Sequence, residues 1–326
     1  MLKVHAAKGF IWGALALVGC SADTSAPPAG SSAEASQAIT QSCDMGLAYN
    51  GGTWQQKPLI AGCTSTTTFS FGVPSDIPLL LGVVRFHLLS QFRTKEIATY
   101  GTTSSDDRLG RFFIDRDDSQ SWTSGDTNTR FMSSPLDSDQ PFIINWETQQ
   151  LVGGSCQFGI GGAGGGPPRR AVVGVKRGST WYIDGNDNGT WDGPGQCDVM
   201  VDEFGASTDI PTPVGNMVGT SGSWGASLVW NFDADGSLSW SGAPPDQSLA
   251  LFGSSSMRPF SDGSSQCIGA QSGTNVYLDK NCNLVWDGEA LDIGATDYLV
   301  SADWRFVGWY TDTFTVGSGG VAGASG

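Results

Sequence analysis

The chain has 326 residues and a formal net charge of −15, with 32 acidic against 17 basic side chains. Such a surface repels nucleic acid and anionic polysaccharide, which excludes both as partners unless a cation intervenes. Only two histidines are present: His5 falls in an N-terminal leader, and His87 falls in an apolar run typical of a strand. A Ser-His-Asp or Cys-His catalytic site therefore has little to build on.

The first 42 residues have the organisation of an exported bacterial lipoprotein. Residues 1–8 carry two lysines and no acid, and residues 9–19 are apolar but too short to span a bilayer. The segment ends in LVGC, which resembles the lipobox, whose cysteine, here Cys20, becomes acylated. An ordinary signal peptide with a chance cysteine is the alternative. We expect a lipoprotein signal peptide over 1–19, a flexible Ser/Ala/Pro tether over 20–42, and attachment to a bacterial membrane, at the outer membrane or cell surface, through lipid alone.

The rest of the chain is patterned as short strands and tight turns. Residues 80–86 and 96–100 alternate as strands do, and 46 glycines fit a chain with many turns. In the clearest unit, 173–217, two short alternating runs precede the hairpin-turn sequence Gly-Asn-Asp-Asn-Gly at 185–189. No segment after the tether has a helical period, so the sequence predicts an all-β fold.

One phrase occurs four times: an aspartate after an apolar residue, small turn-forming residues at alternate positions, and a tryptophan seven residues after the aspartate. The four pairs are Asp115/Trp122, Asp184/Trp191, Asp233/Trp240 and Asp279/Trp286. The intervals between these tryptophans, about 46 to 69 residues, fit one four-stranded propeller blade with its loops. A unit of this size buries too little surface to fold alone, so the repeats must share one domain.

Residues 173–193 resemble the G-V-F-R…W-Y-L-D-x-N-G-N-G-x-W-D-G repeats of secreted bacterial proteins, relatives of the FG-GAP/VCBS-type repeats that build integrin-α-like β-propellers. The match is good over 173–217, fair over 267–294, and degenerate over 96–147 and 226–260. The resemblance implies a β-propeller. It does not imply a metal site, because the carboxylates of the integrin-type calcium loop have no counterpart near 145–146 and 215–216.

The repeats also predict the number of blades. Inner strands are expected near Leu79, Phe142, Pro213 and Phe260, while 298–316 and 46–72 supply strands of one more blade. We predict a β-propeller over 43–316 with five blades, in which the N- and C-terminal strands share one blade and so close the ring. Six or seven blades, or a β-sandwich of hairpins, are the alternatives. The Gly-rich residues 317–326 are predicted to be a disordered tail.

Seven cysteines are present. Assigning Cys20 to lipid leaves six, an even number typical of disulfides in an oxidising compartment. Many connectivities are allowed, and the repeats favour neighbours within a blade. The expected pairs are Cys43–Cys63, Cys156–Cys197 and Cys267–Cys282. Zinc is disfavoured because the chain lacks a C-x-x-C motif and nearly lacks histidine.

Two of the aspartate turns space oxygen-bearing side chains as a calcium loop does. The candidate ligands are Asp184, Asn186, Asn188 and Asp192 in one turn, and Asp279, Asn281, Asn283 and Asp287 in the other. The alternative is a hairpin turn in which the aspartate accepts hydrogen bonds from backbone amides. Calcium is therefore the cofactor that the sequence suggests.

Three tryptophans outside the repeated position, Trp224, Trp304 and Trp309, are candidates for an exposed binding face. No pair of acids stands out by its context as the acid–base pair of a glycosidase. We expect a non-catalytic module for binding, adhesion or scaffolding outside the cytoplasm, with a protein or carbohydrate ligand. A propeller-type glycosidase or a lectin acting on extracellular polysaccharide is the alternative.

Overall fold

The computed structural model describes residues 39–59, 67–81, 96–104, 107–117, 119–158, 169–215, 217–224, 226–240, 246–249, 253–261, 267–279, 304–316 and 322–324. Their regular structure is β-strand, apart from short 3-10 turns such as Pro194–Gln196. The prediction of an all-β chain is confirmed.

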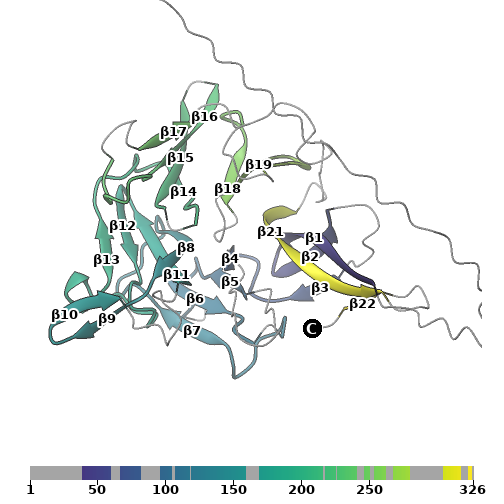
Figure 1. Cartoon of the computed structure of the whole chain (residues 1–326), viewed down its shortest axis with the longest axis horizontal. Helices are drawn as coiled ribbons and strands as arrows, with labels where there is room; N and C mark the ends of the chain where they lie inside the picture. Colours follow the sequence, from purple (N-terminus) through teal and green to yellow (C-terminus); the bar gives the residue numbers. More distant parts are fainter. Residues whose placement is uncertain are drawn as a thin grey trace, which may run out of the picture. The chain divides into compact units, whose positions relative to one another are not determined.

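Five sheets lie in a ring and form a five-bladed β-propeller (Figure 1). Blade 1 is β4 Ile77–Leu81, β5 Glu96–Tyr100, β6 Arg111–Ile114 and β7 Thr127–Arg130. Blade 2 is β8 Gln140–Glu147, β11 Arg169–Arg177, β12 Thr180–Ile183 and β13 Val199–Val201, with the hairpin β9 Gln149–Val152 and β10 Ser155–Phe158 inserted after β8. Blade 3 is β14 Ile210–Pro211, β15 Gly219–Trp224, β16 Ser227–Phe232 and β17 Gln247–Leu249; blade 4 is β18 Arg258–Ser261, β19 Ile268–Ser272 and β20 Asn275–Leu278. The count selects five blades over the alternatives of six or seven and over a sandwich.

Blade 5 contains both ends of the described chain. It orders β22 Ala322–Ala324, β21 Arg305–Val316, β1 Ile39–Asn50, β2 Thr53–Pro58 and β3 Thr67–Ser70. The antiparallel pairing of β1 with β21 runs from Ile39 opposite Val316 to Tyr49 opposite Arg305. The predicted sharing of one blade by the two terminal strands is confirmed. The strands extend past the predicted boundaries, since β1 begins before residue 43 and β22 lies within 317–326.

Alternating burial explains why the strands stack as blades. In β16 every second side chain is buried, and Trp230 and Phe232 are fully enclosed. The cores form between neighbouring blades: Ala98 and Phe112 of blade 1 pack in one cluster with Ile143 and Val173 of blade 2. Each sheet therefore needs its neighbour to bury its apolar face.

Side chains with polar groups recur at one register position, and those of Tyr49, Lys176 and Gln271 form hydrogen bonds to the connection or strand that leads into the next blade. On the second strand of each blade, Tyr49, Tyr100, Lys176, Ser221 and Gln271 pair with the equivalent residue of the third strand. We call these five the junction residues. The Lys176 ammonium donates to the carbonyls of Ala206 and Asp209 at 2.8 and 2.9 Å, in the connection that enters blade 3. Gln271 likewise accepts from the Phe306 amide at 2.9 Å, which fixes the start of β21.

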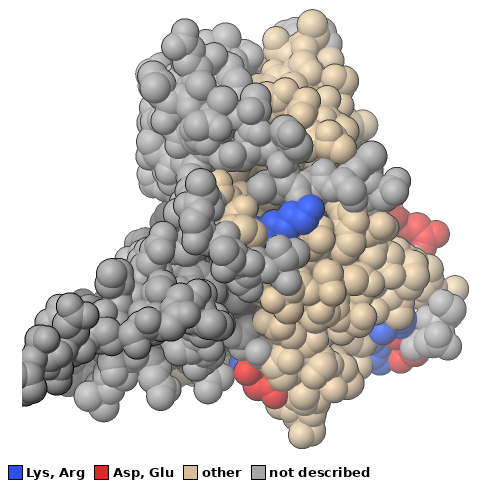
Figure 2. Space-filling model, turned by 90° about the vertical axis from the view of Figure 1, so that its right-hand side faces the viewer, with Lys and Arg blue, Asp and Glu red and all other residues tan. Residues whose placement is uncertain are grey.

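Among the described residues, no helix is long and apolar enough to cross a bilayer. Figure 2 shows one side of the molecule, where the described Lys, Arg, Asp and Glu side chains are few and are surrounded by uncharged surface. The described acids therefore do not gather on this side.

Candidate functional site

The repeated aspartates fold the connections between the third and fourth strands, which we call the carboxylate turns (residues 115–126, 184–198 and 233–246). Asp184 is 1 % exposed, and its two carboxylate oxygens accept from the backbone amides of Asn188 at 3.1 Å and Gly189 at 2.7 Å. Asp115 and Asp233 make the same pair of bonds to the fourth and fifth residues that follow them. The first aspartate thus supplies acceptors that the turn requires.

The other predicted calcium ligands of this turn bind one another or the backbone. Asn186 accepts from the Asn188 amide at 3.1 Å, and the Asn188 side chain donates to Asp192 at 2.6 Å. In the second predicted turn only Asp279 is described: it is buried, and its amide donates to the Ile268 carbonyl at 2.9 Å. Asn281, Asn283 and Asp287 lie outside the described residues. These contacts are those of a hairpin turn, and calcium binding stays a prediction.

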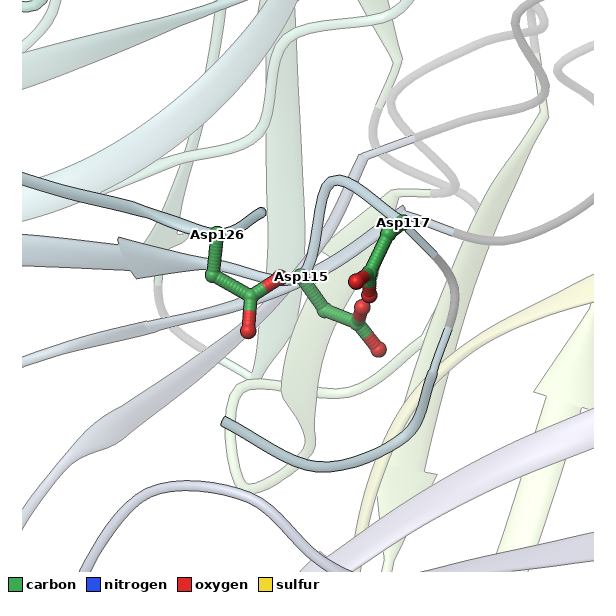
Figure 3. A group of neighbouring side chains, drawn as sticks. All are labelled: Asp115, Asp117 and Asp126. Carbon is green, nitrogen blue, oxygen red and sulfur yellow. The ribbon is translucent and has the colours of Figure 1, made fainter. Parts of the chain in front are cut away.

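A further aspartate joins each turn from a place that sequence analysis missed. Figure 3 shows Asp115, Asp117 and Asp126, whose carboxylates each bring an oxygen within 4.8 Å of the others, as Asp233, Asp235 and Asp246 also do. All six oxygens of the first group accept hydrogen bonds: those of Asp126, for example, accept from the amides of Arg116 at 3.0 Å and Thr123 at 2.6 Å. The group therefore serves as the framework of its turn.

Burial makes the turn of blade 2 sensitive to protonation. Desolvation raises the pKa of Asp184 to about 7 and that of Asp198 to about 6, against hydrogen bonds from backbone amides that lower both. Desolvation also raises the pKa of Asp233. In contrast, hydrogen bonds from Thr123 and Ser119 lower the pKa of the exposed Asp117.

Both cysteines of one predicted disulfide lie in the described part of the chain. Cys156 and Cys197 are bonded, with their Cα atoms 5.2 Å apart, which joins the β9–β10 hairpin to the carboxylate turn of the same blade. Cys267 is also disulfide-bonded. Its predicted partner Cys282, together with Cys20, Cys63 and the side chain of Cys43, lies outside the described part of the chain.

Of the three tryptophans predicted for a binding face, only the side chain of Trp304 is described. Trp304 is half-buried against the core of blades 4 and 5, and the side chains of Trp224 and Trp309 lie outside the described residues. Trp122 and Trp240, from the repeated position, are 52 % and 40 % exposed, although Trp240 also packs edge-on against Phe204 with ring centroids 6.0 Å apart. The three described tryptophans of the repeated position thus pack against aromatic rings, and two of them keep a face open to solvent.

A second set of aspartates stands just before the inner strands. We call Asp76, Asp139 and Asp209 the entry aspartates. Each accepts from a backbone amide three residues earlier, at 3.1, 2.9 and 2.9 Å respectively. Sequence analysis did not single them out, although the recurring Phe-Gly and proline that flank two of them mark the same connection.

A groove of about 590 Å³ opens beside the third entry aspartate. The connection from blade 2 supplies Glu203 and Thr208, while β15, β16 and the carboxylate turn supply Ser223, Asn231 and Trp240. We call it the blade 3 groove. An exposed aromatic face surrounded by carboxylate, hydroxyl and amide groups is typical of a site that orients a polar ligand.

The inner strands also line a smaller cavity of about 240 Å³ at the centre of the ring. Its basic residues are Arg258 and Arg305. The Arg258 guanidinium donates to Gln271 at 3.1 Å and to the Phe306 carbonyl, and burial followed by the charge of Arg305 lowers its pKa well below the usual value. Arg258 therefore has a structural role in joining blades 4 and 5.

No protein-family model, no curated protein and no solved structure matches this chain.

Proposed function

We propose that this protein is a non-catalytic binding module that holds its ligand in the blade 3 groove. The observation that carries the proposal is the groove itself: about 590 Å³ of space open beside a partly exposed tryptophan, on a ring of sheets that keeps its walls in place. Sites on rigid scaffolds can bind without first paying for ordering of the chain.

The acids of the groove favour binding over glycoside hydrolysis. Glycosidases need two carboxylates free to act as acid, base or nucleophile. The two acids here are Glu203 and Asp209, and one oxygen of Asp209 is engaged by the Ala206 amide at 2.9 Å. Asp209 is thereby held as a fixed acceptor, which suits recognition of a donor.

The second candidate is carbohydrate binding, as a lectin or a propeller-type glycosidase. The exposed face of Trp240 favours it, because sugar rings pack against aromatic faces while hydroxyl, amide and carboxylate groups such as Ser223, Asn231 and Glu203 bind their hydroxyls.

The proposal includes export and attachment to a bacterial membrane through a lipid on Cys20, supported by the leader and the lipobox-like LVGC. Calcium in the carboxylate turns is a proposal of the same kind, supported by the spacing of their oxygen-bearing side chains. Cys20→Ala should release the protein from membranes into the soluble fraction.

Binding is tested with the full chain and its Trp240→Ala variant on glycan and protein arrays, beside a panel of chromogenic glycosides. We expect saturable binding that Trp240→Ala weakens at least tenfold, and no turnover. Trp122→Ala is the matched control, since Trp122 is exposed in the same way on blade 1. Sustained turnover that Trp240→Ala abolishes would replace the binding function with the enzymatic alternative.

A further inference from the structure

Two of the three entry aspartates are neutralised by an arginine of the chain. Arg177 binds Asp139 at two points, from Nε to Oδ1 at 2.7 Å and from Nη2 to Oδ2 at 2.8 Å. Arg108 binds Asp76 in the same manner, through Nε at 3.2 Å and through Nη2. A side-on pair of this kind is the geometry that makes arginine specific for a carboxylate.

Blade 3 has the aspartate without the arginine. Gly222 occupies the position of Arg177, because Gly174 pairs with Ile183 as Gly219 pairs with Phe232, three residues earlier in each strand. A Cβ atom added to Gly222 would lie 2.2 Å from Oδ1 of Asp209, so the glycine faces the carboxylate directly. The hairpin from 219 to 232 contains no lysine or arginine.

The Asp209 carboxylate is consequently buried with one oxygen unused. Asp209 is 9 % exposed, its Oδ2 accepts from the Ala206 amide at 2.9 Å, and no described residue donates to its Oδ1. Lys176 donates to the backbone carbonyl of Asp209 at 2.9 Å, and its charge interacts with the Asp209 carboxylate without a hydrogen bond to it. Oδ1 therefore lines the groove as an acceptor that no described group of the chain uses, and a charged donor entering the groove can bind it.

In blades 1 and 2 the arginine of the chain itself occupies the place beside the entry aspartate, whereas in blade 3 a groove opens there. In blade 1 the Arg108 guanidinium lies 3.9 Å from the ring centroid of Phe113. Register places Tyr182 at the position of Phe113 in blade 2 and the smaller Asn231 there in blade 3. With Gly222 in place of an arginine and Asn231 in place of a ring, the groove of about 590 Å³ opens between Asp209 and Trp240.

We propose that the blade 3 groove binds the guanidinium of an arginine side chain presented by a partner protein, in the position that Arg177 and Arg108 hold in blades 2 and 1. The inference rests on the proposed binding function and names its ligand class. Nε and Nη2 of the incoming arginine donate to Asp209, and its guanidinium plane lies against Trp240. The net charge of −15 attracts basic partners and makes their association faster at low salt.

The test is a calorimetric titration of the full chain with N-acetylarginine amide and, separately, with N-acetyllysine amide. We expect saturable binding of the arginine compound and at least fivefold weaker binding of the lysine compound, which cannot make the two-point contact. Asp209→Asn should weaken arginine binding at least tenfold. The amide oxygen still accepts from Ala206, so the fold is preserved, while the amide nitrogen faces the guanidinium.

Asp139→Asn is the matched control, because it makes the same change where Arg177 already fills the site. It should lower the melting temperature and leave the binding of N-acetylarginine amide unchanged. Asp209→Asn should instead weaken that binding and leave the melting temperature unchanged. Equal binding by the two variants, or no binding by the unaltered protein, would overturn the arginine assignment. If arrays then show glycan binding that depends on Trp240, the binding function stands and its ligand is a carbohydrate.

Discussion

Lys176 carries its ammonium group at a position that is 1 % exposed, and burial lowers its pKa. Its two acceptors are backbone carbonyls of the connection into blade 3. Replacing it with methionine keeps the length and apolar stem but removes the ammonium donor. The Ala206 carbonyl still accepts from the Asp209 amide at 3.1 Å, whereas the Asp209 carbonyl loses the bond from Lys176. We expect Lys176→Met to lower the free energy of unfolding by roughly 2 kcal/mol, since unsatisfied buried acceptors cost about 1–3 kcal/mol.

Chemical denaturation measures this loss. Lys57→Met is the matched control, because Lys57 lies half-buried on β2 away from the junction positions and should change stability by less than about 0.5 kcal/mol. A Lys176 variant as stable as the Lys57 variant would show that the junction contributes no stability at this blade boundary.

Asp184 should make stability depend on pH. Its folded pKa of about 7 is above its unfolded value of 3.8, so between these values the folded state holds a proton that the unfolded state has lost. The contribution to stability is complete at acid pH and is lost as the pH rises through about 7. We expect the unfolding free energy to be higher at pH 5 than at pH 8 by on the order of a few kcal/mol, and Asp184→Asn to remove most of that difference.

Asp117→Asn is the control for this pH dependence, because the pKa of Asp117 is lowered and its titration falls below this range.

Added calcium distinguishes a turn that only binds its own backbone amides from a turn that binds the ion. If Asp184 serves only backbone amides, millimolar calcium leaves the melting temperature at pH 8 unchanged. A rise that disappears in Asp184→Ala with Asp279→Ala would instead place the ion in these turns.

At the scale of elements, the β9–β10 hairpin is an insertion between the first two strands of blade 2 that is covalently joined to the turn after β12. The bridged cysteines are 41 residues apart. Removing the bridge with Cys156→Ala and Cys197→Ala should lower the unfolding free energy by about 3–4 kcal/mol, because the unfolded chain regains the freedom of that loop.

Denaturation under non-reducing conditions measures the loss. Each single variant should be as unstable as the double variant, since either substitution breaks the same bridge. A double variant as stable as the unaltered chain would show that the bridge adds no stability beyond noncovalent contacts such as the hydrogen bond from the Gln149 amide to the Gly185 carbonyl, at 2.8 Å.

Sequence periodicity was sufficient to predict the strands and blades, but not the side-chain contacts between them. Alternation located β5 and β12, and the aspartate–tryptophan phrase located the blades, because both signals depend only on neighbouring residues. The entry aspartates were missed because their arginines come from unlike places: Arg177 ends a strand, whereas Arg108 stands in a longer loop. Exposure of Trp122 and Trp240 could not be read from spacing, since it depends on what the next blade places above each ring.

For the whole molecule, the ring is a closed series of blade junctions. Cores between blades 1 and 2 and between blades 2 and 3 mix residues of both neighbours, so no sheet is complete alone. The blade 3 groove follows from this arrangement. Blades 1 and 2 pair their entry aspartate with an arginine and blade 3 does not, while the apolar clusters between the blades hold the ring in all three places.

The shared blade also determines when this protein can fold. β1 is among the first described strands to be synthesised, yet its antiparallel partner β21 is made only after the four other blades. No partial chain that leaves the ribosome can close the ring, and the pairing of β1 with β21 has the largest sequence separation of any strand pair described. Such late, non-local pairing slows folding. Until β21 is made the ring stays open, and an open ring during synthesis would suit the export that we propose for this protein.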